Sequence, residues 1–191
     1  MGMTFVGGLP ETKCGAGSMM SNTTNVRNEL RGLLDELGVK VLLDAPCGDC
    51  NWIFHVDLSG IEYIGADNDD ENLLSAINRM PSGTFMSLDI LSRIPKADLM
   101  LCRDFLQHLP NEDVWKVLNN FCESGIEWLL ATSHENESNE DLKRVGGFRP
   151  LNLLLEPFRL PPAIKSLQDG PGRLLSLWNA SSILKRMSKA H

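Results

Sequence analysis

The sequence of 191 residues contains no apolar run that approaches the roughly 18–20 residues needed to cross a bilayer, so we predict no membrane-spanning segment. It also lacks an excess of positive charge, because 18 Lys and Arg stand against 25 Asp and Glu for a net charge of −7. A chain with this balance has no general attraction for phosphate backbones or anionic membrane surfaces. We therefore expect neither a nucleic-acid partner nor a membrane partner.

The amino-terminal end lacks the basic stretch and apolar segment that mark a secretory signal. The chain has five Cys, and without a secretory signal these are expected to be reduced thiols in a cytoplasmic protein. Beyond Cys47 and Cys50, no second pair of Cys or His stands at the spacing of a zinc site. We therefore predict no metal.

Short apolar runs alternate along the chain with segments of helical periodicity. This alternation predicts a parallel sheet with helices on both faces. Two late strands, one of them at 173–178, would complete the sheet, with a hairpin as one arrangement. The other predicted strands lie at 39–43, 61–66, 84–88, 97–102 and 128–132, and two predicted helices lie at 70–80 and 112–123.

The expected fold is a single α/β domain, a Rossmann-like three-layer sandwich with a mostly parallel seven-stranded sheet. Residues 1–21 show no periodicity and are predicted to form an arm. Apolar residues recur at helical spacing over residues 22–38, which predicts an amino-terminal helix. Residues 39–135 are the predicted binding core, and residues 136–191 are predicted to supply a loop on the substrate side and the final strands.

Carboxylates follow three of the predicted strands, at Asp44, Asp67 and Asp89. In an open parallel sheet, ligands bind beyond the carboxyl ends of the strands. Asp67 follows Asp44 by 23 positions, which is the spacing of an acidic residue that accepts the ribose hydroxyls of a nucleoside cofactor. The alternative for each of these residues is a local role, as a helix cap or a turn residue.

The turn at residues 44–49 lacks the full G-x-G-x-x-G of a dinucleotide site, and the chain has no G-x-x-x-x-G-K-[ST] phosphate loop. A single glycine, Gly48, allows close approach of the backbone to a ligand. The pattern therefore favours a nucleoside-like ligand without a pyrophosphate.

These residues resemble class I S-adenosylmethionine-dependent methyltransferases over about residues 22–135. The whole chain is also similar to a bacterial branch of that superfamily with a D-x-P-C-G-D form of motif I. Pro46 and Cys50 stand where the usual motif has glycine. The resemblance is carried by four segments in the family's order, at 41–48 (motif I), 63–67, 87–90 and 98–110, the last running into an H-L-P turn.

The resemblance implies S-adenosyl-L-methionine as the cofactor and methyl transfer to a small or medium acceptor. It implies that Asp67 binds the ribose and Asp89 the adenine amino group. It also places Arg103, Asp104 and His108 at the catalytic site, although a structural ion pair and a helix-start role are the alternatives for them. The implied cofactor contacts are Asp44, Ala45, Pro46, Cys47, Gly48, Asp67, Asn68, Asp89, Ile90 and Arg103.

Several further residues have a functional hypothesis beside a structural one. His134 follows the fifth predicted strand and could face the substrate, and Trp52 could line the cofactor cleft rather than the core. Arg27 could reach the methionine carboxylate or be solvated. The acidic residues at 135–141 could form a rim for a cationic substrate or a solvated loop, and residues 15–22 and 135–147 could cover the site.

Two other function classes fit parts of the sequence. Cys47 and Cys50 form a C-x-x-C after a strand, which is also where a redox dithiol is found. A cofactor-binding module without turnover is the second alternative, because the glycine pattern of motif I is altered and no general base is obvious. The oligomeric state, the acceptor and the methylated atom are not specified by the sequence.

Overall fold

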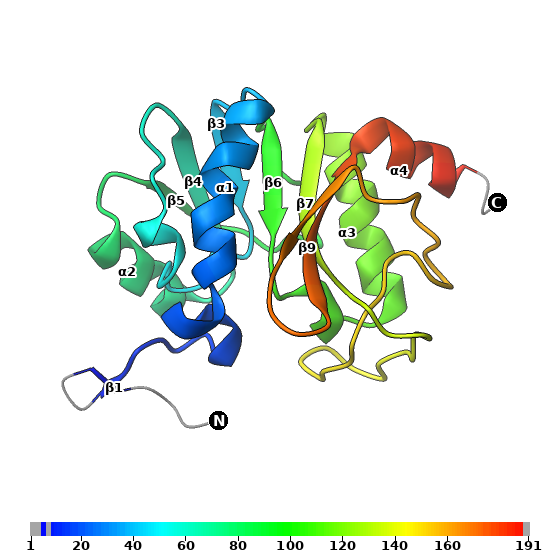
Figure 1. Cartoon of the computed structure of the whole chain (residues 1–191), viewed down its shortest axis with the longest axis horizontal. Helices are drawn as coiled ribbons and strands as arrows, with labels where there is room; N and C mark the ends of the chain where they lie inside the picture. Colours follow the sequence, from blue (N-terminus) through cyan, green and yellow to red (C-terminus); the bar gives the residue numbers. More distant parts are fainter. Residues whose placement is uncertain (1–4, 7–8, 189–191) are drawn as a thin grey trace.

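A computed structural model describes residues 5–6 and 9–188 (Figure 1). Residues 1–4 and 7–8 of the predicted arm, and residues 189–191 of the predicted final segment, lie outside the described residues. The centre is a seven-stranded sheet in the order β5-β4-β3-β6-β7-β9-β8. Its strands are β3 (Val41–Asp44), β4 (Glu62–Asp67), β5 (Thr84–Ser87), β6 (Leu99–Cys102), β7 (Trp128–His134), β8 (Lys165–Gln168) and β9 (Arg173–Asn179).

The helices lie on both faces of this sheet (Figure 1). Buried residues of α1 and α2 share one apolar cluster, and those of α3 and α4 share the other. Among the described residues, no helix combines the length and apolarity needed to span a bilayer. The helices are α1 (Thr24–Glu36), α2 (Asp70–Arg79), α3 (Asn111–Ser124) and α4 (Ala180–Met187), with 3₁₀ turns η1 (Ala16–Ser18), η2 (Met20–Asn22), η3 (Ile53–His55) and η4 (Leu106–His108), and a two-stranded pair of β1 (Phe5–Val6) and β2 (Leu9–Pro10).

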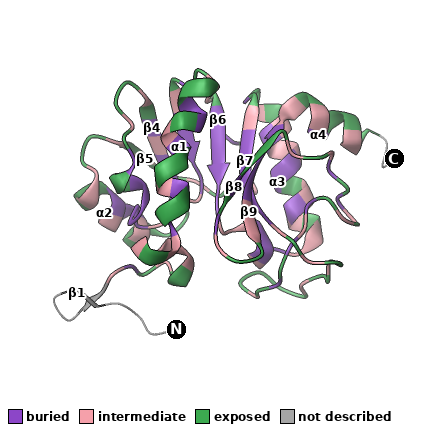
Figure 2. Cartoon of the chain, in the orientation of Figure 1, coloured by how far each residue is buried: buried purple, intermediate pink, exposed green. Residues whose placement is uncertain are grey.

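The two apolar clusters follow from the alternation of side chains along the strands. Leu42 of β3 packs in the cluster that contains α1, whereas the next residue, Leu43, packs in the cluster that contains α3. β6 lies at the middle of the sheet and all four of its residues are buried (Figure 2). The central strands are thus covered on both sides, which leaves their carboxyl ends as the expected place for a ligand.

The prediction of a mostly parallel sheet is wrong in one respect, because the sheet is mixed. Four neighbouring pairs are parallel, but β9 runs antiparallel to both β7 and β8. The physical reason is the short connection at residues 169–172, since a tight turn joins only antiparallel strands. The antiparallel β9 brings its first residue, Arg173, beside the last residue of β7, His134.

Candidate functional site

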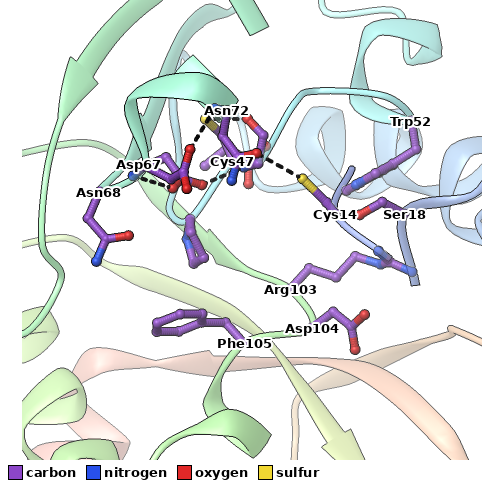
Figure 3. Close-up of a pocket in the computed structure, with 14 residues that line it drawn as sticks. Cys14, Ser18, Cys47, Trp52, Asp67, Asn68, Asn72, Arg103, Asp104 and Phe105 are labelled. Carbon is purple, nitrogen blue, oxygen red and sulfur yellow. Dashed lines mark hydrogen bonds between the residues drawn. The ribbon is translucent and has the colours of Figure 1, made fainter. Parts of the chain in front are cut away.

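The carboxyl ends of β3, β4 and β6 surround a cavity of about 320 Å³, which we call the first cavity (Figure 3). The structure brings most of the predicted strand-end residues together here. Sequence reasoning missed four further lining residues, Cys14, Asp69, Asn72 and Phe105. The predicted residues in the lining are Asp44, Pro46, Cys47, Gly48, Trp52, Asp67, Asn68, Arg103 and Asp104.

The turn after β3 is held against the neighbouring strand and the amino-terminal segment. Cys47 N–H donates to Ala66 O at 2.8 Å. Gly48 has a φ of +56°, and a Cβ there would lie 2.7 Å from Cys14 Sγ, so a larger residue requires a shift. Cys50 also has a positive φ, of 55°. The backbone therefore keeps a glycine-like conformation at Cys50, where the usual motif has a glycine, and its side chain makes that conformation strained.

Asp67 connects this turn to the start of α2. Its Oδ2 accepts the Gly48 N–H at 2.8 Å, and its Oδ1 accepts the Asp69 N–H at 2.9 Å. The residue is 4% exposed and lines the first cavity. A carboxylate has about four acceptor positions, so these two backbone bonds leave others for a ligand.

Asp44 is the most deeply buried acid of the first cavity. Tyr63 donates its hydroxyl to Asp44 Oδ2 at 2.8 Å, and Asp44 is 3% exposed. Burial raises the pKa of Asp44 to about 7, although the Tyr63 hydrogen bond and the Arg103 charge act in the opposite direction. The protein therefore holds a carboxyl that changes its charge near neutral pH.

Arg103, the residue after β6, donates its hydrogen bonds to other residues of the protein. Its Nε and Nη2 donate to Asp169 Oδ1 at 3.1 and 2.8 Å, and Nη2 also donates to Gly17 O at 2.8 Å. Its guanidinium lies 5.0 Å from the centre of the Trp52 ring. The adjacent Arg103–Asp104 residues do not pair with each other; each is paired instead with a residue of the β8–β9 hairpin.

Asp104 has a φ of +57°, which is unusual for a residue with a side chain. Its Oδ1 accepts from Arg173 Nη1 at 2.9 Å and also from Gln107 Nε2. A Cβ on Gly17 would overlap Asp104 Oδ2, so the amino-terminal segment passes directly over this carboxylate. Backbone strain of this kind is concentrated at functional sites.

The amino-terminal segment, residues 11–22, is anchored rather than loose. Thr12 Oγ1 donates to Asp49 Oδ1 at 3.0 Å. Asn51 Nδ2 donates to Glu11 Oε1 and to Ser18 O, both at 2.8 Å. These bonds join residues 33–40 positions apart, which explains why no local sequence pattern indicated them. The prediction that residues 15–22 cover the site agrees with their placement beside both Arg103 and Asp104.

Other predicted residues lie outside the lining of the first cavity. Asp89 accepts the Leu91 N–H at 2.9 Å in an exposed turn, and Ala45 and Ile90 are buried in the core. His108 Nδ1 lies 2.7 Å from Gly147 O. Arg27 Nη2 donates to Met20 O at 3.0 Å, so this side chain binds the backbone of the amino-terminal segment.

The C-x-x-C pair does not have the character of a redox dithiol. Cys47 and Cys50 are free and buried. The hydrogen bond with Cys50 and burial raise the pKa of Cys47, so its thiol stays protonated at neutral pH. Across residues 5–6 and 9–188, no group of three or more His, Cys, Asp or Glu could hold a metal ion.

The segment at residues 135–147 packs on the start of α3 instead of on the first cavity. Asp141 Oδ1 accepts the Asn111 N–H at 2.8 Å, and the Gly146 N–H donates to His108 O at 2.9 Å. The acidic residues of this segment are exposed. The structure therefore favours a solvated loop over a cover for the first cavity.

A second cavity of about 490 Å³ lies on the other side of the amino-terminal segment. Its lining includes Ala16 and Gly17, whereas Ser18 lines the first cavity. The η1 turn at Ala16–Ser18 and the paired side chains of Arg103 and Asp104 therefore form the wall between the two cavities. His134, proposed from the sequence as a substrate-side residue, lines the second cavity.

No family model matches the sequence, and no curated protein matches it. The solved structures that are similar in fold include the following three. TnmH has a TM-score of 0.65 and 16% identity, with 85% of this chain and 56% of that chain covered. Human N-acetylserotonin methyltransferase in complex with SAM has a TM-score of 0.61 and 12% identity, with 81% and 51% covered. Magnesium protoporphyrin IX methyltransferase from Synechocystis PCC 6803 with bound SAH has a TM-score of 0.53 and 17% identity, with 63% and 59% covered.

The chain therefore spans between 51% and 59% of the length of these three structures. At identities this low, the structural similarity shows the fold alone. The activity has to be argued from the site. On the strand order and these similarities, the chain has the α/β Rossmann-like class I fold of S-adenosylmethionine-dependent methyltransferases, with a mixed seven-stranded sheet.

Proposed function

We propose that the first cavity binds S-adenosylmethionine and that the protein transfers its methyl group to a small or medium acceptor with an oxygen or nitrogen nucleophile. When bound, this cofactor supplies a methyl carbon that its sulfonium already activates. The chain then has to hold the two reactants in line and keep water out. The observation that carries the proposal is the buried Asp67 carboxylate, which ends β4 and lines the first cavity.

The residues present fit a nucleoside. Asp67 is fixed by the Gly48 and Asp69 N–H groups, and its remaining acceptor positions suit the two hydroxyls of a ribose. A carboxylate held in advance loses little conformational freedom when it binds a ligand. The absence of a Cβ at Gly48 keeps the turn close to the amino-terminal segment, which closes this end of the first cavity.

The residues also fit the charge of the cofactor. Asp44 lines the first cavity and is held near its titration point by burial. A sulfonium or ammonium group beside it favours the ionised carboxylate, because opposite charges nearby lower the pKa of an acid. Asp44 therefore provides attraction for a cation without a permanently buried, unpaired negative charge.

Arg103 and Asp104 are proposed as positioning residues. Arg103 is held by Asp169 and Gly17, and Asp104 is held by Arg173. These bonds fix the wall at the end of β6, where the acceptor would approach. An in-line displacement needs such alignment more than it needs a base when the nucleophile is already ionised. A catalytic role for His108 remains a prediction.

The test is calorimetric titration with S-adenosylmethionine and S-adenosylhomocysteine. Asp67→Asn keeps the shape of the side chain, removes its charge and loses one of the two hydrogen bonds from backbone N–H groups, so we expect a loss of affinity of at least about tenfold for both ligands. Glu62→Gln is the matched control, because Glu62 is exposed at the opposite end of the same strand. Equal affinities in the wild type and Asp67→Asn, or no binding by the wild type, would refute the proposed function.

A methyl-transfer assay with the same protein distinguishes an enzyme from a binding module. Transfer of a labelled methyl group to any acceptor in a panel of small phenols, amines and carboxylates supports the enzyme. Binding of both ligands without transfer supports the module. The D-x-P-C-G-D form of motif I is the ground for proposing membership of a bacterial branch of this superfamily.

A further inference from the structure

The second cavity lies where the start of α1, the β8–β9 turn and the end of β7 meet. Its volume of about 490 Å³ is within the range of about 300–1,000 Å³ that is typical of small-molecule sites. The η1 turn separates it from the first cavity, so a molecule bound here lies beyond the reach of an in-line methyl transfer. Any role of the second cavity is therefore separate from methyl transfer.

The charges in this lining are balanced. Asp169 and Arg173 both line the second cavity, and Arg173 Nε lies 3.3 Å from Asp169 Oδ2. Asp169 Oδ1 also accepts from Arg103 Nη2 at 2.8 Å, and Arg173 Nη1 donates to the Asp104 carboxylate at 2.9 Å. Burial lowers the pKa of His134, the third lining residue that can carry a charge, which favours its neutral ring. A charged ligand would lose its hydration here without gaining an unpaired opposite charge, so the lining favours a neutral ligand.

Most of the other polar side chains in the lining are hydroxyls and amides, which can both donate and accept hydrogen bonds. Asn22 Nδ2 donates to Ala16 O at 2.7 Å and Gln168 Nε2 donates to Gly170 O at 2.6 Å, which leaves the two amide oxygens as acceptors. The side chain of Asn25 forms no hydrogen bond with any of the described residues. These neutral lining residues are Ser21, Asn22, Thr24, Asn25 and Gln168.

His134 and Arg173 add nitrogen atoms to this set. His134 Nδ1 lies 3.2 Å from Leu151 N and 3.4 Å from Leu151 O, so the backbone accommodates either neutral tautomer of the ring. The other ring nitrogen, Nε2, can then accept or donate. Arg173 Nη2 donates to none of the residues that the structure describes, so it is a donor for a ligand. This mixture of donors and acceptors suits a ligand whose own groups do both, as hydroxyl groups do.

One aromatic ring lies beside these polar groups. Phe148 lines the second cavity and is 64% exposed, and its ring centre lies 6.1 Å from that of His134. The face of an aromatic ring is negative and attracts C–H groups, which carry a small positive charge. A sugar ring combines a face of C–H groups with hydroxyls around its edge. A flat base or an aliphatic chain offers no such set of hydroxyls to the neutral polar side chains.

We propose that the second cavity is a binding site for a neutral saccharide. Phe148 packs on the C–H face of one sugar ring, and the hydroxyl and amide side chains, with His134 and Arg173, bind its hydroxyls. The backbone of the η1 turn keeps this sugar away from the first cavity, so it is recognised here and not methylated here. This recognition needs only the second cavity and does not depend on a cofactor in the first.

The experiment is saturation-transfer NMR of the full chain with glucose, galactose, mannose and N-acetylglucosamine. We expect transfer from the protein to the C–H protons of at least one of these sugars, because one C–H face packs on Phe148. The uronic acid and the 2-amino derivative of that sugar are the charged probes of nearly the same shape, and we expect neither to bind more tightly than the neutral sugar. No transfer to any of the four sugars, or tighter binding of a charged derivative, would overturn the proposal.

Variants at exposed positions locate the sugar. We expect Phe148→Ala to weaken its binding by about fivefold and Asn25→Ala by about threefold. Phe54→Ala is the control for the first variant, because Phe54 is also an exposed phenylalanine and lines neither cavity. Asn28→Ala is the control for the second, because Asn28 is an exposed asparagine of the same helix outside the lining. Unchanged affinity in Phe148→Ala, or equal losses in a lining variant and its control, would place the sugar elsewhere and overturn the proposal.

Competition distinguishes the two cavities. The η1 turn lies between them, so saturating S-adenosylhomocysteine is expected to leave the sugar bound. Displacement of the sugar by S-adenosylhomocysteine would place it in the first cavity and overturn the second site. A protein that binds the sugar but not S-adenosylhomocysteine would refute the proposed function alone.

Discussion

Replacing Asp44 with Asn should change how the stability of the protein depends on pH. An unfolded Asp carboxyl ionises near pH 3.8, whereas burial raises the pKa of folded Asp44 to about 7. Between these values the folded state binds a proton that the unfolded state has lost, so stability falls as pH rises. The difference of roughly 3 pKa units corresponds to at most about 4 kcal/mol, of which roughly 3 kcal/mol is lost between pH 5 and pH 9.

Asn cannot ionise and its amide oxygen can still accept the Tyr63 hydroxyl, so Asp44→Asn isolates this one titration. The measurement is urea unfolding of both proteins at pH 5, 7 and 9, followed by tryptophan fluorescence. Contributions from other groups cancel when the two proteins are compared at each pH. We expect the wild type to lose roughly 3 kcal/mol relative to Asp44→Asn over this range. A constant difference between the two proteins would refute the argument.

The same titration should appear in ligand binding. A cation next to Asp44 lowers its pKa, so binding of S-adenosylmethionine releases a proton below about pH 7. Affinity should therefore rise between pH 6 and pH 8, by up to about tenfold for one coupled proton. Asp44→Asn should bind more weakly and without this pH dependence. If affinity depends on pH in the same way in the wild type and in Asp44→Asn, the cation does not change the titration of Asp44 and the argument is refuted.

Two further substitutions test the wall and the thiols. Gly17→Ala introduces a Cβ that overlaps the Asp104 carboxylate, so we expect a loss of about 1–3 kcal/mol in urea unfolding. Gly32→Ala, in the exposed middle of α1 with open space around it, should instead gain up to about 1 kcal/mol. The double variant Cys47→Ser, Cys50→Ser should keep its affinity for S-adenosylhomocysteine in calorimetry, whereas loss of methyl transfer with retained binding would support thiol chemistry.

Much of the core could be predicted because the information is local. The apolar runs and helical spacings located β3 to β7 and α1 to α3 to within a few residues. Acidic residues at strand ends then follow from the topology, since parallel strands present their carboxyl ends at one edge. This reasoning brought Asp44, Asp67 and Asp104 to one cavity, but Asp89, the third strand-end carboxylate that it placed with Asp44 and Asp67, lies in an exposed turn outside that lining.

The β8–β9 hairpin shows where local information ends. β8 has only four residues, and Leu167 alone among them is buried, so no period identifies the strand. β9 is antiparallel to β7, and this pairing makes the sheet mixed and brings Arg173 beside His134. The alternating pattern of the chain predicted a mostly parallel sheet, and a hairpin was one arrangement expected for its last two strands. The short turn between β8 and β9 forms this hairpin and reverses the chain direction.

Long-range polar contacts were beyond prediction for a different reason. Arg103 and Asp169 are 66 positions apart, and no local pattern around either residue predicts that the two form a pair. The interpretation of Arg103 and Asp104 as a mutual pair was reasonable from adjacency. Instead, each side chain is paired with the β8–β9 hairpin, Arg103 with Asp169 and Asp104 with Arg173.

The wall between the two cavities is where these long-range contacts converge. A methyl group moves between molecules only when the nucleophile is about 3 Å from the methyl carbon, so the backbone between the two cavities excludes direct transfer from one to the other. At Gly17 the wall has no side chain, and its carbonyl is held by Arg103. Any side chain at position 17 would meet Asp104, which itself holds Arg173 of the second cavity. The backbone at Gly17, the side chains of Arg103 and Asp104, and Arg173 in the lining of the second cavity therefore form one connected arrangement.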